Sequence, residues 1–205
     1  MKSRREITRR SPRLSCSALM WFVILALPSV VAGQYSTEQF SQIRGRSIGP
    51  AGMSGRVASV DVVKSSPNTI YVGAATGGVW RSVDGGISWE PIFDDQPLLG
   101  IGAVAVSPVT PDLVWVGTGE GNPRNSAGVG NGVYKSLDGG DTWARVGLEG
   151  SERIDKIIPH PTDPDVAFVA AMGPAWSDGD VRGVYRTQDG GDTWERILYE
   201  NPRTG

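Results

Sequence analysis

The sequence has almost no cysteine and almost no histidine: its 205 residues include one of each, Cys16 and His160. Cys16 lies before an apolar run, within a segment that we expect to be removed on export. The mature chain then has neither a disulfide nor a thiolate metal site, so packing and hydrogen bonding must stabilise it. His160 has no second histidine with which to share a metal. The sequence therefore predicts no metal site and no cofactor.

A strong charge of either sign is also missing. Lysine and arginine together number 20 and aspartate and glutamate 22, which gives a formal net charge of −2. Residues 1–33 hold six of the basic residues and one acidic residue, so the remainder carries 14 basic and 21 acidic residues, a net charge of −7. A chain of this sign has no electrostatic footprint for DNA or RNA, and we expect no nucleic-acid partner.

No apolar run is long enough for a membrane span. The run at 18–27 has about half of the roughly 20 residues that a membrane-spanning helix needs. It follows a basic start and precedes small residues, a pattern typical of a secretory signal peptide cleaved after Ala32 or Gly33. We expect residues 1–33 to be this signal, of the Sec type rather than the twin-arginine type. The mature protein would then be secreted or periplasmic, without a stable membrane span; a permanent amino-terminal anchor is the alternative.

Three segments of twelve residues align without gaps, at 78–89, 132–143 and 183–194. In each, Asp-Gly-Gly joins a short strand pattern to a tryptophan, and the glycines can supply the positive φ angles of a tight turn. We expect β-hairpins in which the Asp carboxylate and a Ser or Thr hydroxyl bond to the backbone of the turn, while the Trp covers the hairpin. The residues given this structural role are Ser82, Asp84, Gly86, Trp89, Ser136, Asp138, Gly140, Trp143, Thr187, Asp189, Gly191 and Trp194.

A second hairpin pattern, turning at prolines, precedes each of these segments. Four short antiparallel strands therefore recur at a spacing of 51 to 54 residues, and such a four-stranded unit is a β-propeller blade. We predict an all-β chain in which 34–205 forms three blades, at about 46–96, 97–149 and 150–200. Because a propeller closes with four or more blades, we expect an incomplete propeller, the amino-terminal part of a longer protein. The missing blades would come from the longer parent chain or from other copies.

The repeat resembles the Asp-box, or BNR repeat, of sialidases, sortilin-type propellers and xyloglucanase-type glycoside hydrolases. The sequence around it, such as 117–120, is similar to that of large secreted bacterial proteins with sortilin-like propellers, which are often labelled glycosyl hydrolase. The resemblance implies a propeller fold for 46–200. In xyloglucanase-type enzymes the first catalytic Asp lies in a stretch that resembles 71–81, where this sequence has Ala75. No catalytic pair of carboxylates and no sialidase Arg-Ile-Pro motif can be assigned.

The strand order predicts that the stack of blades has two different faces, each formed by the turns and loops at one end of the strands. The Asp-Gly-Gly turns should share one face with the proline turns, and the loops between the second and third strands of each blade should occupy the other. Two of those loops are long, and enlarged loops on a rigid scaffold are where binding residues tend to lie. The candidate ligand-binding residues are Arg56, close to the axis, and, on the long loops, Glu120, Asn122, Arg124, Trp176, Asp178 and Asp180. Local pairing of Glu120 with Arg124 and packing of Trp176 are the structural alternatives.

Three functions are compatible with this pattern. The favoured one is an exported, non-catalytic propeller scaffold that binds a peptide, protein or glycan through its long-loop face. The alternative is an extracellular glycoside hydrolase, xyloglucanase-like or sialidase-like, whose catalytic carboxylates lie partly outside this chain. A third is an assembly factor resembling the Asp-box proteins that help to build photosynthetic membrane complexes. The alanine at position 75 favours the first function over the second.

Overall fold

The computed structural model describes residues 56–122 and 127–204. All described residues belong to one compact unit, Arg46–Gly205. The predicted signal peptide and Arg124 lie outside the described residues. The described part contains twelve strands and no helix, so it holds no helix that could cross a membrane.

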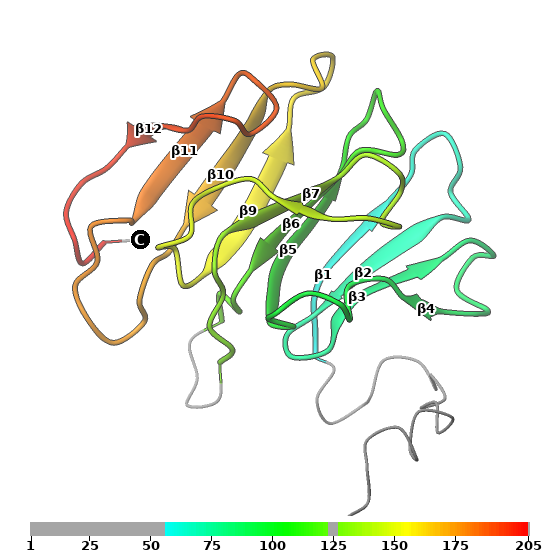
Figure 1. The fold of residues 1–205 in the computed structure, drawn as a ribbon, viewed down its shortest axis with the longest axis horizontal. Helices are drawn as coiled ribbons and strands as arrows, with labels where there is room; N and C mark the ends of the chain where they lie inside the picture. Colours follow the sequence, from blue (N-terminus) through cyan, green and yellow to red (C-terminus); the bar gives the residue numbers. More distant parts are fainter. Residues whose placement is uncertain (1–55, 123–126, 205) are drawn as a thin grey trace, which may run out of the picture. The chain divides into compact units, whose positions relative to one another are not determined.

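The strands form three four-stranded antiparallel sheets, each built from consecutive strands (Figure 1). Blade one consists of β1 (Val57–Val62), β2 (Ile70–Ala74), β3 (Gly78–Ser82) and β4 (Glu90–Pro91). Blade two consists of β5 (Ile101–Val106), β6 (Val114–Thr118), β7 (Val133–Ser136) and β8 (Ala144–Arg145). Blade three consists of β9 (Ile154–Pro159), β10 (Ala167–Ala171), β11 (Gly183–Thr187) and β12 (Glu195–Leu198). This order of strands is that of propeller blades, and the predicted all-β class is confirmed.

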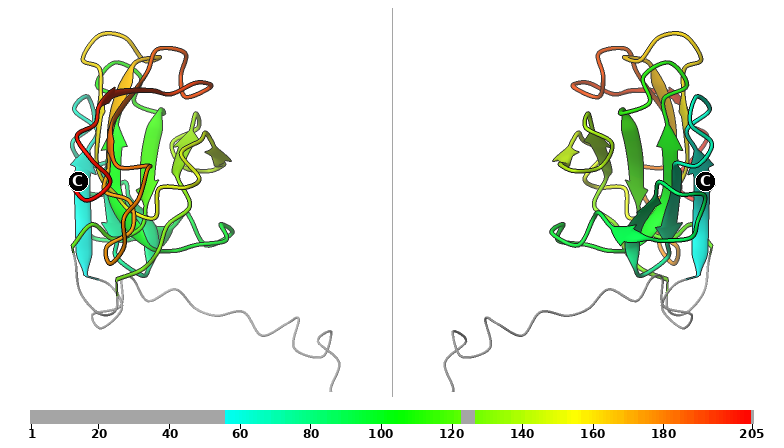
Figure 2. Two further views of the ribbon diagram at one scale, coloured as in Figure 1. Left: turned by 90° about the vertical axis from the view of Figure 1, so that its left-hand side faces the viewer. Right: turned by 90° about the vertical axis from the view of Figure 1, so that its right-hand side faces the viewer.

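The blades stack side by side through their first strands. Strand β5 lies between β1 and β9, so blade two is the middle blade (Figure 1). Figure 2 views the sheets from the two sides, and they overlap in both views, as stacked sheets do. Most of the buried apolar residues therefore lie between consecutive blades, and a third, smaller cluster, Val72, Ala74 and Trp80, belongs to blade one alone.

Two apolar clusters fill the spaces between the blades. The first joins blades one and two and includes Val79, Ile101 and Tyr134. The second joins blades two and three and includes Trp115 and Ile154. Each cluster depends on a small residue in the second strand of the first of the two blades that it joins. At Gly73 an added Cβ would lie 2.6 Å from Ile101 Cγ2, and an added Cβ at Gly117 would clash with Ile154 in the same way. Glycine is required at both positions because the next blade packs directly against the backbone.

The three Asp-Gly-Gly turns have the predicted internal bonding. In blade one the Ser82 hydroxyl donates to Asp84 Oδ1 (2.8 Å), and the Gly86 N–H donates to Ser82 Oγ (2.8 Å). The Ser88 hydroxyl and N–H both donate to the Asp84 carboxylate, at 2.6 and 2.9 Å. Blades two and three repeat this pattern around Asp138 and Asp189. The turn is therefore held from within by one carboxylate and one hydroxyl.

These bonds favour the charged form of each carboxylate. Donation from the Ser88 hydroxyl and N–H lowers the pKa of Asp84 to about 2, and the same bonds from Thr193 lower the pKa of Asp189 to about 2. The pKa of Asp138 is lowered by its bonds from Thr142.

The indole N–H groups of the three turns bond different kinds of partner. The Trp143 Nε1–H donates to Ile92 O of blade one (2.7 Å), and the Trp194 Nε1–H donates to Val146 O of blade two (2.6 Å). Only Trp89 bonds within its own turn, to Gly86 O (3.0 Å). The indole N–H of Trp143 and of Trp194 therefore bonds the preceding blade, a contact that the sequence did not predict, while the ring of Trp143 also lies next to Gly140 of its own turn. Both bonds form because the end of the fourth strand of that preceding blade lies within reach of the indole N–H.

The Asp-Gly-Gly turns lie on the face expected for them. In every blade the first glycine of the turn donates its N–H to a carbonyl in the proline turn between the first two strands. The donors are Gly85, Gly139 and Gly190, and the acceptors are Asn68, Asp112 and Asp165. The loops between the second and third strands lie at the opposite end of the sheets (Figure 1).

Candidate functional site

The long-loop face carries a half-buried ion pair between blades one and two. Glu120 follows β6 and is fully buried, and it accepts a hydrogen bond at Oε1 from Arg56 Nη2, just before β1. The Arg56 guanidinium remains partly exposed. No described residue bonds the second carboxylate oxygen, Glu120 Oε2, which is also buried. The pair therefore joins the axial edge of blade one to the loop of blade two.

The placement of Glu120 corrects the prediction that it is an exposed loop residue. The Glu120 N–H donates to Gly128 O (3.0 Å) and the Gly119 N–H to Gly100 O (2.7 Å), which ties this segment into the space between the blades. Gly119 has a φ of +86°, and a side chain there would meet the backbone of Glu152. The described partner of Glu120 is Arg56; Arg124, its partner in the structural alternative, lies outside the described residues.

The base of the loop in blade two is closed by one hydroxyl. The Thr118 hydroxyl donates to Gly132 O (2.7 Å) and accepts from the Asn131 N–H (2.8 Å). Because Thr118 is fully buried, this bridge fixes where the loop leaves and rejoins the sheet. Asn122, a candidate from the sequence, lies exposed beyond this base.

Ala75 lies beside the ion pair. It follows β2, is almost fully buried, and donates its N–H to Arg56 O (2.8 Å). The resemblance to xyloglucanase-type enzymes assigns a catalytic Asp to this position. The methyl group of Ala75 can neither donate nor accept a proton, so the position has no acid–base chemistry in this chain.

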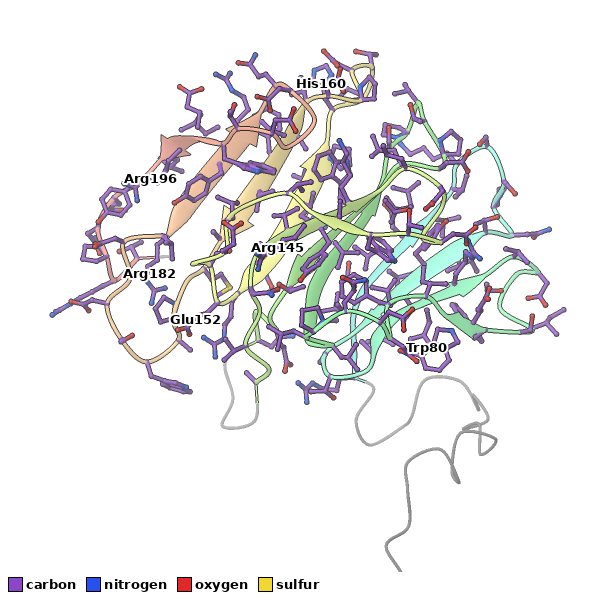
Figure 3. The ribbon with its side chains drawn as sticks, viewed as in Figure 1. Trp80, Arg145, Glu152, His160, Arg182 and Arg196 are labelled. Atoms are coloured by element: carbon purple, nitrogen blue, oxygen red, sulfur yellow. The ribbon has the colours of Figure 1, made fainter. Side chains whose placement is uncertain are left out.

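The loop of blade three is organised by Arg182, which sequence reasoning did not single out. Its guanidinium donates to four carbonyl oxygens, those of Met172, Pro174, Ser177 and Pro202. In Figure 3, Arg182 and Glu152 lie toward the end of the sheets opposite His160. A single cation in the loop 172–182, which is rich in Gly and Pro, is the signal that could have pointed to Arg182.

The remaining candidates in this loop lie at its surface. The side chain of Trp176 is strongly exposed (73%). The Asp178 carboxylate accepts a hydrogen bond from Arg203 Nε (3.0 Å), and Asp180 is exposed, with its carbonyl bonded by Arg196. The structure therefore groups these three residues on one loop and leaves the indole of Trp176 free to contact a ligand.

A cavity of about 160 Å³ lies between the loops of blades two and three, lined by Gly121, Arg153, Met172, Gly173, Pro174, Ala175 and Arg182. Arg153 is buried, and its contact with Glu152 is long (3.4 Å). No described residue bonds Arg153 Nε. The two arginines give the wall of this cavity a positive charge, which favours a ligand with oxygen atoms or a carboxylate, and the Arg182 guanidinium already bonds four carbonyl oxygens. No group of side chains that could hold a metal occurs in the described part of the chain.

The fold and these loops define the described chain as a set of propeller blades, and its relatives include polysaccharide-cleaving enzymes. No family model matches. The chain is 28% identical over 165 residues to a xyloglucanase of Paenibacillus sp, covering 73% of this chain and 15% of that protein. It is 29% identical over 165 residues to a probable oligoxyloglucan-reducing end-specific xyloglucanase of Neosartorya fischeri, covering 76% and 18%. The chain thus spans about a sixth of the length of these curated relatives.

Solved structures confirm the propeller fold. An ancestral GH74 enzyme matches with a TM-score of 0.59 at 22% identity, over 77% of this chain and 20% of that one. The GH74 enzyme of Niastella koreensis matches with a TM-score of 0.53 at 25% identity, over 68% and 22%. YCF48 from Cyanidioschyzon merolae matches with a TM-score of 0.52 at 21% identity, over 74% and 40%.

Proposed function

We propose that this chain is part of an exported propeller protein related to the xyloglucanases, and that its long-loop face binds a glycan of the xyloglucan class. The observation that carries the proposal is the similarity to xyloglucanases over 165 residues, which includes most of the described blades. The proposal favours the glycoside hydrolase alternative of the sequence analysis over a scaffold without a glycan partner. Export to the periplasm or the medium is part of it, since a polysaccharide substrate is found there.

The chemistry of the long-loop face supports a sugar ligand. An exposed indole such as that of Trp176 offers a flat apolar surface on which a sugar ring can stack. Arg153 and Arg182 line the adjacent cavity, and their positive charge favours the oxygen atoms of a ligand. The ion pair of Arg56 with Glu120 would hold the loop of blade two in place beside the ligand.

We place binding rather than bond cleavage on the described residues. Glycoside hydrolysis requires two carboxylates, one acid and one base or nucleophile, across the scissile bond. Ala75 removes the carboxylate at one position, and Glu120 is buried and already bonded to Arg56. Hydrolysis by the whole protein would therefore need carboxylates from outside the described blades.

Affinity electrophoresis of the exported chain through gels with and without xyloglucan tests the proposal. We expect retardation in xyloglucan gels but not in gels that contain mannan, and a clear loss of retardation in Trp176→Ala. Leu137→Ala, an exposed apolar substitution on the opposite face, is the matched control and should keep it. Equal mobility in all gels would refute the proposal. A reducing-sugar assay on the same samples separates binding from cleavage.

A peptide ligand is the second candidate. One solved neighbour is YCF48 bound to D1 peptide, which matches with a TM-score of 0.51 at 15% identity. The arginine-lined cavity could bind a peptide carboxylate by charge-assisted hydrogen bonds. A peptide array probed with the exported chain tests this function. Binding to peptides with a free terminal carboxylate, together with unretarded migration in xyloglucan gels, would favour it over the glycan.

A further inference from the structure

Arg153 is a buried cation whose guanidinium has few partners. The residue lies just before β9 and is 4% exposed. A guanidinium carries five N–H donors. Among the described residues, Arg153 donates one side-chain hydrogen bond, from Nη1 to Glu152 Oε2, and that bond is long (3.4 Å). Because buried polar groups are normally hydrogen-bonded, the described residues leave most of these donors without the acceptors that they need.

Arg182 brings a second buried cation to the same cavity. It is 8% exposed, and its four hydrogen bonds all go to neutral carbonyl oxygens. No described carboxylate forms an ion pair with it. Buried charges are normally paired with a charge of opposite sign. The cavity between the loops of blades two and three therefore lies beside two buried positive charges, of which one has no charged partner.

Two carboxylates lie near this cavity, and both remain in contact with water. The side chain of Glu152 is 42% exposed, and Asp155, which lies next to Gly121 in the cavity wall, is exposed. Charges that face water are screened, so they offset a buried cation only in part. We therefore expect the inside of the cavity to favour a negatively charged group.

The rest of the cavity wall is apolar and comes from blades two and three alone. Gly121 follows β6, and the other wall residues lie at the start of β9 and in the loop between β10 and β11. Met172, Pro174 and Ala175 supply carbon surface beside the two arginines. A mostly apolar wall with a few polar groups is typical of a site for an organic ligand, so the negative group should belong to a carbon skeleton.

The cavity is continuous with the surface around Trp176. Ala175 and Arg182 line the cavity and also the open hollow at the exposed indole. A sugar ring stacked on that indole can therefore extend a neighbouring group toward the arginines. This arrangement favours an acidic sugar over an isolated anion, because one glycan can use both the flat apolar surface and the two cations.

We propose that this cavity binds the carboxylate of a uronate, a sugar acid within the glycan that the long-loop face binds. The two oxygens of a carboxylate can accept parallel hydrogen bonds from a guanidinium, so they supply acceptors that Arg153 lacks. This inference rests on the proposed function, since it takes Trp176 as the surface for the adjacent ring. It adds the charge of the ligand: a carboxylated glycan is preferred to neutral xyloglucan.

Affinity electrophoresis with three forms of one polymer tests the proposal. The forms are xyloglucan, xyloglucan whose primary hydroxyls are partly oxidised to carboxylates, and the oxidised polymer after methyl esterification, which removes the charge again. We expect the oxidised form to bind the exported chain at least about tenfold more tightly than the ester, the effect of one hydrogen bond to a charged group. General attraction cannot produce this preference, because residues 34–205 carry 14 basic and 21 acidic residues and repel an anionic polymer.

Two arginine variants assign the preference to the cavity. Arg153→Met removes the charge and fills a similar volume, so the preference for the oxidised form over the ester should disappear. Arg145→Met makes the same change at a partly exposed arginine of β8 that does not line the cavity, and it should keep the preference. Circular dichroism verifies the fold of each variant. If Arg153→Met does not fold, Ala175→Asp places a carboxylate of the protein in the cavity wall and should abolish the preference with Arg153 in place.

The outcomes separate this site from the proposed function. Retardation by xyloglucan with no gain on oxidation would support the proposed function and overturn the carboxylate site, as would a preference retained by folded Arg153→Met. Retardation by the oxidised polymer alone would support the site and refute the binding of neutral xyloglucan. Equal mobility in all gels would overturn both, and binding to peptides with a free terminal carboxylate in its place would assign the cavity to a peptide.

Discussion

Replacing Trp143 by phenylalanine isolates the bond that its indole makes to the preceding blade. The substitution removes the Nε1–H that bonds Ile92 O (2.7 Å), while the smaller ring can still pack edge-to-face on Phe93, whose centroid lies 5.1 Å from that of Trp143. Leaving a half-buried carbonyl without its donor, at a contact between two blades, costs about 1–3 kcal/mol. We therefore expect Trp143→Phe to lower the free energy of unfolding by about 1–3 kcal/mol.

Trp89→Phe is the matched control, because it removes the same group from the corresponding turn. The acceptor of Trp89 is Gly86 O in its own turn, so the loss of this donor breaks no contact between blades. We expect a loss of about 0.5–1 kcal/mol there. Urea unfolding of the exported chain, followed by circular dichroism, gives both values from the midpoint and slope of the transition. Equal losses for the two variants would refute the assignment of Trp143 as a contact between blades.

Three further predictions concern the ion pair, the turns and the loop surface. Glu120→Ala should lower the free energy of unfolding by about 1–3 kcal/mol, measured by urea unfolding, because it leaves a cavity and removes the carboxylate that Arg56 bonds; an unchanged midpoint would contradict the burial of this pair. The pKa of Asp189 is lowered to about 2 in the fold, so the charged carboxylate stabilises the folded chain at any pH above the pKa of the unfolded chain, near 3.8. This stabilisation is lost as the pH falls from about 4 to 2. Asp189→Asn should therefore weaken the dependence of the urea midpoint on pH between about 4 and 2. Trp176→Ala should change stability by less than about 0.5 kcal/mol while reducing retardation on xyloglucan, and a destabilised variant would mean that the indole is a packing residue.

The fold could be predicted from the sequence because its signals are local. Each Asp-Gly-Gly turn requires two glycines at positive φ and one carboxylate at a fixed offset, and these residues recur in all three blades. The alternation of strand patterns and proline turns then gives the strand order. The partners of Trp143 and Trp194 could not be predicted in this way, because their acceptors lie about fifty positions earlier, at 92 and 146, in another blade.

The candidate site was less predictable, because its residues act over long distances in the sequence. Glu120 stands in a segment rich in glycine, which indicates an exposed loop, yet Gly119 and Gly121 are there because side chains would clash with Glu152 and Asp155 of the next blade. Its partner Arg56 is 64 positions away. Trp176, in contrast, lies at the surface as expected, because the residues of its loop pair with no strand.

The same reasoning explains why the small residues of the second strands say more than the apolar ones about which parts of the chain pack together. Valine and isoleucine in a strand indicate burial but not the neighbour against which they pack. A glycine inside a strand weakens it, so Gly73 and Gly117 indicate that another backbone or side chain comes close at those positions. At the two junctions the register places a glycine at this one position, and the first-strand residues of the next blade that face it are Ile101 and Ile154. The places where consecutive blades meet could therefore have been found in the sequence, once the register of the blades was known.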